Sequence, residues 1–153
     1  MITYQVESYL DVLPELKAIY PEHYKELAAN KELVKLNPDY DKYEALAKAN
    51  LLHLVTVRKD NELIGYHLSV ISPHLHYMNS LTCFTDIFLV RKQFRKEENG
   101  FIGLKLFKKL EESVKERGVQ RIYMGTKLSL DISPILKRLG YSPIEQLFTK
   151  ELI

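Results

Sequence analysis

The stretch from Thr82 to Leu110 constrains the fold of this chain more than any other part of the sequence. Its opening run, Thr82 to Val90, is almost entirely β-branched, aromatic and aliphatic, which predicts a buried strand. One acid, Asp86, interrupts the run. A basic, glycine-containing loop and a long amphipathic helix follow. We therefore expect a strand–loop–helix unit with an acid inside a buried strand.

The loop after this strand predicts an anion-binding site. Its cations are Arg91, Lys92, Arg95 and Lys96, and it ends at Asn99 to Gly103, where the helix begins. Unpaired backbone N–H groups and the helix dipole both favour negative charge at a helix start. A solvated surface loop is the alternative interpretation of the same residues.

Composition sets the outer bounds. The chain of 153 residues suits a single domain, residues 1–153, with a core of ordinary size. The single cysteine, Cys83, excludes an internal disulfide and is expected to be a packing residue. No apolar run approaches the ~20 residues of a membrane span, so we expect a soluble, cytoplasmic protein. A net charge of +2 gives little support for a nucleic-acid partner.

Before Thr82, the pattern predicts helices that follow a short strand. Tyr4 to Ser8 fits an edge strand, and Asp11 to Ala29 is helical, with Pro21 expected to start a second helix. A further helix is expected from Pro38 to Asn50. Its apolar stripe, which includes Tyr43, is interpreted as core, with substrate contact as the alternative for Tyr43.

A β-hairpin comes next. Leu51 to Arg58 and Glu62 to Ser72 read as strands joined by the tight-turn residues 59–61, and they should pair antiparallel. His67 is expected to be an ordinary sheet residue.

Pro73 to Ser80 is expected to be an irregular connection. It carries His74, His76 and Tyr77. Substrate contact or proton handling and a plain surface loop both remain open for these side chains.

After the basic loop, a helix is expected from Gly100 to Arg117, and a strand from Arg121 to Thr126. The strand should lie parallel to the Thr82 strand because a helix connects the two. Asp131 to Arg138 predicts a short helix, and Tyr141 to Leu152 predicts one or two closing strands. The expected fold class is α/β (α+β): one mixed, mostly antiparallel sheet of about six or seven strands, flanked by helices.

Three motifs within this order are specific in combination. Residues 86–90 (DIFLV) resemble the fourth strand of a known fold, residues 93–95 (QFR) resemble its Glu-Tyr-Arg turn, and residues 138–141 (RLGY) resemble its closing Lys-Leu-Gly-Phe. Together they resemble the GNAT superfamily of N-acetyltransferases over essentially the whole chain. The PHLHY segment, residues 73–77, is similar to GNAT proteins from bacteriophages and some bacteria.

The resemblance implies that the strands Thr82–Val90 and Arg121–Thr126 splay apart and that acetyl-coenzyme A lies in the gap as cosubstrate, without a metal. It implies that the pantetheine arm pairs with main-chain groups of Phe88, Leu89 and Val90. It places the pyrophosphate on the loop and helix start, at Arg95, Lys96, Asn99, Gly100, Phe101, Ile102 and Gly103.

The chain departs from the family pattern at two places. Glu98 and Phe101 stand where the loop's basic residue and first glycine belong, so the loop is longer. Leu136 stands where many members have a tyrosine that protonates the departing thiolate. Tyr141, Tyr123, Ser133 or a water would have to replace it.

Asp86 is the first candidate for catalysis. It alternates with Phe84, Phe88 and Val90, so we expect it on the same face of the strand, in apolar surroundings that would suit it to accept the proton of an amine. A buried aspartate satisfied by a backbone or histidine partner is the alternative. His76, with His74, is the second candidate.

These observations favour an acetyl-coenzyme A-dependent N-acetyltransferase acting on a primary amine of a small molecule or a protein. The alternative is a GNAT-fold binding or regulatory protein that binds coenzyme A or a partner without efficient turnover. A third hypothesis is binding to nucleic acid through residues 91–96, which the near-neutral charge disfavours. Exposed edges of the closing strands would suit a homodimer.

Overall fold

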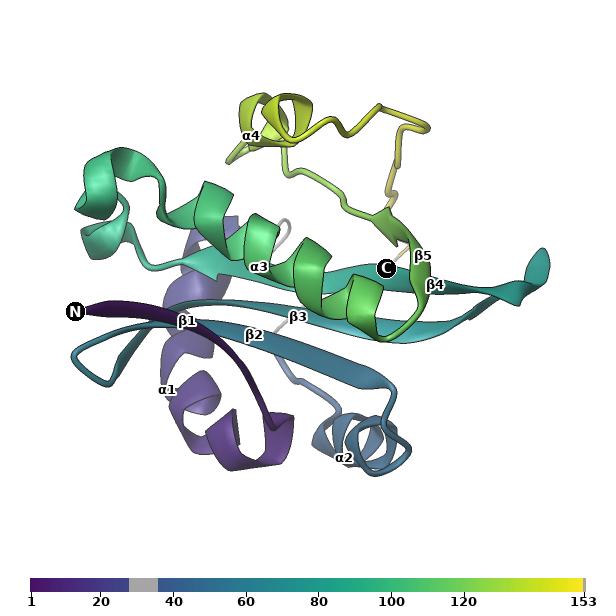
Figure 1. Ribbon diagram of the computed structural model, residues 1–153, viewed down its shortest axis with the longest axis horizontal. Helices are drawn as coiled ribbons and strands as arrows, with labels where there is room; N and C mark the ends of the chain where they lie inside the picture. The colour runs from purple at the N-terminus through teal and green to yellow at the C-terminus, as the bar shows by residue number, and fades with distance from the viewer. Residues whose placement is uncertain (28–35, 153) are drawn as a thin grey trace.

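The computed structural model describes residues 1–27 and 36–152, in which five strands form one sheet in the order β1-β2-β3-β4-β5 (Figure 1). The strands are β1 Ile2–Glu7, β2 Leu52–Lys59, β3 Glu62–His74, β4 Tyr77–Val90 and β5 Val119–Tyr123. β1 to β4 pair antiparallel, and β5 lies parallel to β4. The predicted class, a mixed and mostly antiparallel sheet with helices, is confirmed with fewer strands.

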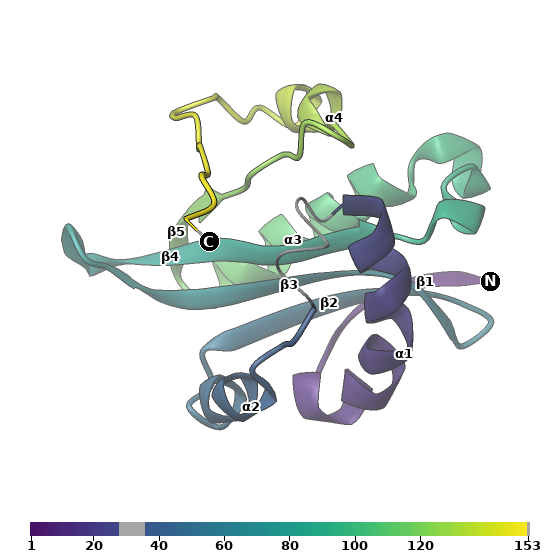
Figure 2. The same ribbon diagram turned by 180° about the vertical axis from the view of Figure 1, so that it is seen from behind.

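Helices cover both faces of the sheet (Figures 1 and 2). α1 Tyr9–Leu27 and α2 Tyr40–Lys48 pack on one face, and α3 Ile102–Glu116 and α4 Ser133–Arg138 pack on the other. The core on the α3 face includes Val55, Ile64, Cys83 and Phe107, and the core on the α1 face includes Leu16, Leu54 and Tyr66. Cys83 is fully buried, as expected for a packing residue.

α1 continues through both of its prolines, Pro14 and Pro21, so the prediction of a second helix starting at Pro21 is wrong. An internal proline removes one helical hydrogen bond and costs about 3 kcal/mol or more. Buried side chains at helical spacing, Val12 and Leu16 among them, offset this by packing on the sheet. Residues 28 and 29 of the predicted helix lie outside the described residues.

The hairpin between β2 and β3 is confirmed. Its turn residues Asp60 and Asn61 both have left-handed backbone angles, with φ of 48° and 72°, as tight two-residue turns require.

The expected irregular connection over residues 73–80 is wrong, because β3 runs on to His74 and β4 begins at Tyr77. Pro73 lies beside a register shift in the ladder, where a residue without an N–H is tolerated.

The pairing of β4 with β5 is short. It runs from Leu81 and Val119 to Phe84 and Tyr123, whereas β4 itself continues to Val90. Beyond Phe84, therefore, β5 no longer pairs with β4, and a gap opens between the two strands.

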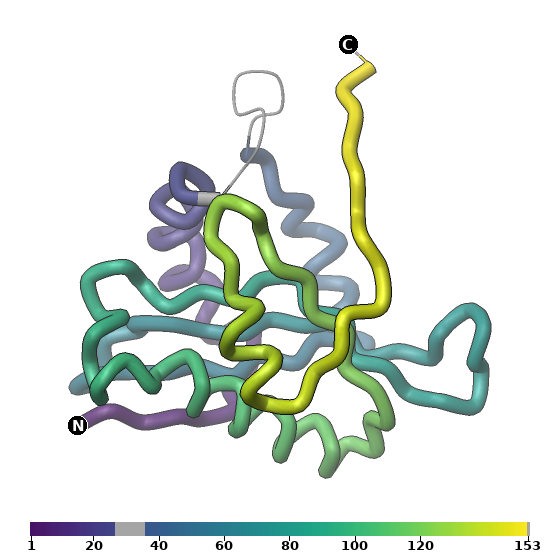
Figure 3. Tube along the Cα trace, turned by 90° about the horizontal axis from the view of Figure 1, so that it is seen from above, coloured from purple at the N-terminus to yellow at the C-terminus, as the bar shows by residue number. Residues whose placement is uncertain are grey.

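The closing strands expected over residues 141–152 are absent from the described structure. This segment has neither helix nor strand, and Figure 3 shows it running out from the sheet as an extended arm. Its apolar side chains, Ile144, Leu147, Phe148 and Leu152, are 71–95% exposed. None of the described helices has the length and apolarity needed to cross a membrane.

Candidate active site

Asp86 lies at a β-bulge in β4. Ser69 of β3 faces Thr85 and Leu68 faces Ile87, so Asp86 is an extra residue without a partner in the ladder. A one-residue slip reverses which face each later side chain takes. Asp86 therefore does not share a face with Phe88 as the alternation predicted.

The contacts on the two sides confirm this correction. The ring of Phe88 lies 4.7 Å from that of Phe107 on α3. Asp86 instead accepts a hydrogen bond from the hydroxyl of Tyr43 on α2, on the opposite face. Phe84 precedes the bulge and shares the face of Asp86, because its neighbour Cys83 belongs to the α3 core.

The surroundings of Asp86 are more open than expected, because the residue is exposed rather than buried. Its partner Tyr43 is half-buried and stacks on Tyr9 at 5.5 Å. Burial, and then the hydrogen bond to Asp86, raises the pKa of Tyr43, so its phenol stays protonated and donates to the carboxylate at neutral pH. Tyr43, which the sequence predicts as core, is thus the direct partner of the candidate base.

The backbone of β4 offers an open edge along the gap. The N–H of Arg91 donates to Ile64 of β3, so Val90, one residue earlier, directs its backbone groups away from β3. The Val90 carbonyl indeed accepts from Nε of Arg95, at 2.7 Å. Phe88 has the same orientation as Val90, whereas Leu89 points its backbone to β3 and its side chain into the α1-side core.

The two arginines of the basic loop are used within the fold, whereas no ion pair is seen for Lys92 or Lys96 within the described residues. Arg95 pairs with Glu26 of α1 as well as with the Val90 carbonyl. Arg91 lies 3.1 Å from Glu62 and 3.5 Å from Glu22. Both arginines therefore fix the loop to the fold.

The loop forms two short 3-10 helices, Lys92–Phe94 and Glu97–Gly100, and then turns sharply. Glu98, Asn99 and Gly100 have φ of 50°, 58° and 80° in succession, a left-handed run that only glycine adopts without strain. The lengthened loop predicted from the sequence is therefore wound into a compact reversal.

Glu98 is held by partners of its own. Its carboxylate accepts from the Tyr4 hydroxyl at 2.6 Å and pairs with Lys105 at 3.0 Å. These contacts hold the Glu98 carboxylate in place near the start of α3, where its negative charge would repel a bound anion.

The start of α3 provides unpaired backbone donors. In the described structure, Phe101 gives the helix no side-chain cap, and the N–H groups of Ile102 and Gly103 have no protein acceptor. A Cβ on Gly103 would lie 3.4 Å from Ile135 of α4 and 3.5 Å from Phe88, so this helix start packs closely between α4 and β4.

Arg138 was not identified from the sequence as a cofactor residue. Its guanidinium lies 5.2 Å from the ring centre of Phe101, so α4 adds a cation beside the first turn of α3. Only the fold could reveal this, because the two residues come from separate elements.

Tyr141, the candidate general acid, lies on the α3 face. Its ring is 6.1 Å from that of Phe107, and its buried hydroxyl makes no hydrogen bond with a described residue. Burial, and then the Glu111 carboxylate, raises the pKa of Tyr141. Leu136 is buried, and the Ser133 hydroxyl donates to Asp131 at 2.5 Å.

His76 is exposed at the turn of the β3–β4 hairpin, and the structure shows no hydrogen bond from it to Asp86 within the described residues. Its backbone N–H donates to Nδ1 of His74 at 3.0 Å. His74 itself packs back onto Phe84 and Tyr123, at 5.8 Å from each ring. The structure thus brings His74, rather than His76, towards the gap.

Solved structures match this fold along almost the whole chain. An aminoglycoside acetyltransferase from an uncultured soil metagenomic sample gives a TM-score of 0.74 at 15% identity, over 100% of this chain and 99% of its own. A predicted acetyltransferase from Clostridium acetobutylicum, solved with acetyl-CoA, gives 0.70 at 16%, over 99% and 97%. A ribosomal-protein-alanine N-acetyltransferase from Brucella melitensis gives 0.70 at 13%, over 99% and 99%. No family model and no curated protein matches the sequence.

The chain has the GNAT fold. In GNAT terms, β4 and β5 are the splayed parallel pair, and the loop that follows β4 leads into α3. The predicted GNAT resemblance is therefore confirmed at the level of the fold.

Proposed function

We propose that this protein is an acetyl-coenzyme A-dependent N-acetyltransferase that acts on a primary amine of a small molecule or a protein. One observation carries the proposal: the bulge presents the Asp86 carboxylate just beyond the point where β5 stops pairing with β4. The open backbone edge of Phe88 and Val90 and the uncapped start of α3 adjoin the same gap.

The residues present fit acetyl-coenzyme A. The outward N–H and carbonyl of Phe88, with the N–H of Val90, can pair with the amide groups of a pantetheine arm. The first-turn N–H groups of Ile102 and Gly103 suit a pyrophosphate, and Arg138 adds positive charge beside them. Lys96 is exposed in the same loop and has no ion pair in the described structure, so it is free to approach the pyrophosphate, whereas Arg95 would act by shaping the loop.

In the proposed reaction, the nitrogen of a neutral amine forms a bond to the acetyl carbon as the carbon–sulfur bond of the cosubstrate breaks. Asp86 accepts the proton that the amine loses, directly or through one water. Tyr43 holds the carboxylate in place on the acceptor face. Tyr141, on the opposite face, is the protein hydroxyl proposed to supply a proton to the leaving thiolate.

Thermal melting tests cofactor binding. Saturating acetyl-coenzyme A should raise the melting temperature, since a ligand at a hundred times its dissociation constant adds about 2.7 kcal/mol to the free energy of unfolding. Absence of any shift at millimolar ligand would remove the proposal.

Thiol release over a panel of amines tests turnover. Asp86→Asn should lower kcat/KM by about a hundredfold or more, as expected for loss of a general base, while leaving the acetyl-coenzyme A shift unchanged. Asp41→Asn, which removes an exposed acid from α2, is the matched control and should behave as the parent. Full activity in Asp86→Asn would exclude Asp86 from the mechanism.

A GNAT-fold protein that binds coenzyme A without efficient turnover is the second candidate. It is favoured by the buried Leu136 on α4, where the resemblance expects a tyrosine. A thermal shift with acetyl-coenzyme A and no thiol release with any amine of the panel would support it.

A further inference from the structure

An aromatic surface extends from the candidate site along β4 and β5. Phe84 and Tyr123 are register partners whose rings stack face to face, 4.6 Å apart and inclined by only 5°. His74 stacks against both, and Phe84 remains 40% exposed. This aromatic platform of His74, Phe84 and Tyr123 lies on the same face of the sheet as Asp86.

A cation stands at the far end of the platform. Arg121 donates from its guanidinium to the Tyr123 hydroxyl at 3.0 Å and lies 5.4 Å from the ring centre of Tyr77. It forms no ion pair with a carboxylate of the described residues. Arg58, by contrast, pairs with glutamates on β1 and α1. Arg121 is exposed, so its guanidinium is accessible to a ligand.

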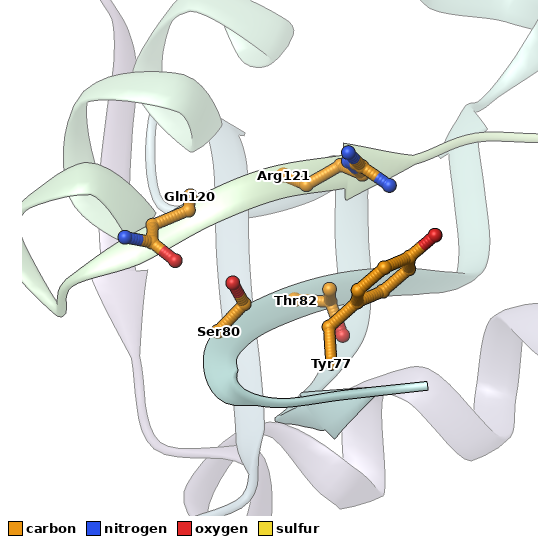
Figure 4. A pocket seen from close by; sticks show the side chains of 5 residues that line it. All are labelled: Tyr77, Ser80, Thr82, Gln120 and Arg121. Atoms are coloured by element: carbon orange, nitrogen blue, oxygen red, sulfur yellow. The ribbon is translucent and has the colours of Figure 1, made fainter. Parts of the chain in front are cut away.

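A pocket of about 110 Å³ lies between this cation and the curled start of β4 (Figure 4). Its lining residues are Tyr77, Ser80, Thr82, Gln120 and Arg121. They offer hydroxyl, amide and guanidinium groups, and no carboxylate. The pocket is smaller than the 300–1,000 Å³ typical of drug-sized ligands, but it suits a single carboxylate or phosphate group.

The distance between this pocket and Asp86 sets the length of a ligand that could reach both. Thr82 and Asp86 lie on one strand, so at ~3.3 Å per residue they are about 10–13 Å apart. The exposed ring of Phe84 lies between them.

We infer that the aromatic platform and Arg121 form a second subsite for the acceptor, which binds a carboxylate or phosphate group at the end remote from the reacting amine. The inference rests on the proposed function and names its acceptor class. In such an acceptor, the amine would lie at Asp86, a flat or apolar middle part would lie on the aromatic platform, and the anionic end would bind Arg121. A polycation is disfavoured, because Arg121 already lies over the rings of Tyr77 and Tyr123 and its charge would repel a second positive group there.

Binding to the protein saturated with coenzyme A tests the inference without requiring turnover. The probes are the C-terminally amidated tripeptides Gly-Phe-Glu, Gly-Phe-Gln and Gly-Phe-Arg, whose amine and last side chain span a comparable length. Calorimetry should show that the glutamate peptide binds about tenfold more tightly than the other two, because its carboxylate can form charge-assisted hydrogen bonds with the guanidinium.

Two variants test whether Arg121 causes the preference for the glutamate peptide. Arg121→Gln should remove it, whereas Lys115→Gln, which removes an exposed cation from α3 on the other face, should retain it. In steady-state assays the loss in Arg121→Gln should lie in KM rather than kcat, because the contact is remote from the reacting atoms.

Equal affinities for the three peptides, absence of peptide binding, or a preference that survives in Arg121→Gln would overturn the inference. Failure of the proposed function is distinguishable, because it would show as absent coenzyme A binding or absent thiol release. Efficient acetylation of sisomicin, a polycation bound by one structural neighbour, in preference to the glutamate peptide would also overturn the inference.

Discussion

The guanidinium of Arg117 lies 3.2 Å from Nδ1 of His53, a side chain that is only 3% exposed. The other ring nitrogen, Nε2, lies 2.8 Å from the Ser113 hydroxyl, which in turn donates to the Leu110 carbonyl. Because the arginine donates to Nδ1, the ring is neutral and Nε2 carries the hydrogen. Burial, and then Arg117, lowers the pKa of His53 to about 4.

This arrangement predicts a loss of stability in acid. The folded state holds His53 neutral, so the unfolded state binds more protons below its pKa of 6.5. The contribution of His53 to the free energy of unfolding should therefore be fully present above about pH 6.5. It should fall by about 2 kcal/mol as the pH is lowered to 5, and the fall should level off below about pH 4. Urea unfolding at several pH values measures it.

The control for His53 uses a histidine in solvent. His53→Gln should flatten the pH dependence, and His76→Gln, at the exposed hairpin turn, should keep the slope of the parent. An unchanged slope in His53→Gln would assign the acid sensitivity to another group, of which the buried His67 is the first to examine.

Gly65→Ala should destabilise the sheet. An added Cβ would lie 2.8 Å from the Leu89 carbonyl oxygen and 2.8 Å from a Val57 methyl group, so neighbouring strands would have to move. We expect a loss of about 1–3 kcal/mol in chemical denaturation. Gly125→Ala has no atom within 4 Å of its Cβ and should change stability by less than about 0.5 kcal/mol. Equal stability of the two variants would contradict the tight strand packing.

Tyr43→Phe should reduce activity while leaving the fold intact. The ring can keep its stacking on Tyr9, but the donor to Asp86 is lost, so the carboxylate is no longer held on the acceptor face. We expect kcat/KM to fall about tenfold, the size of one charge-assisted hydrogen bond. Tyr40→Phe on the same helix serves as control, and a similar fall in both variants would point to α2 packing instead.

Glu98→Gln should strengthen coenzyme A binding. The amide oxygen can still accept from Tyr4, so the loop keeps its shape, while one negative charge near the α3 start is removed and Lys105 is released. Coulomb repulsion of this size predicts a two- to fivefold lower dissociation constant by calorimetry, a gain that high salt should erase. Glu116→Gln, at the far end of α3, should leave the affinity unchanged. Weaker binding in Glu98→Gln would mean that the ion pair shapes the site.

The sequence predicts most of the sheet and α3 because their signals are local. The period of buried side chains in α3, the left-handed turn at Asp60 and Asn61, and the helix that forces β5 parallel to β4 each depend on a few neighbouring residues. Pro21 is one exception, since tertiary packing overrides its preference to break a helix, and residues 73–80 are another, since strand pairing continues into a segment expected to be irregular.

The candidate site is harder to predict because its contacts are distant in sequence. Nothing local marks Glu26 as the partner of Arg95, Tyr43 as that of Asp86, or Arg138 as the neighbour of Phe101. The arm at residues 141–152 has the composition of a strand but forms no strand in the described structure, so composition alone predicted it wrongly.

The bulge at Asp86 reverses, within one strand, which alternate side chains face α3. Odd-numbered residues such as Cys83 face α3 before it, and even-numbered residues such as Phe88 face α3 after it. Both halves of β4 can thus turn apolar side chains towards the same core while a single acid is exposed between them. Deleting that one residue would bring the two halves back into phase and leave a continuous, chemically inert strand.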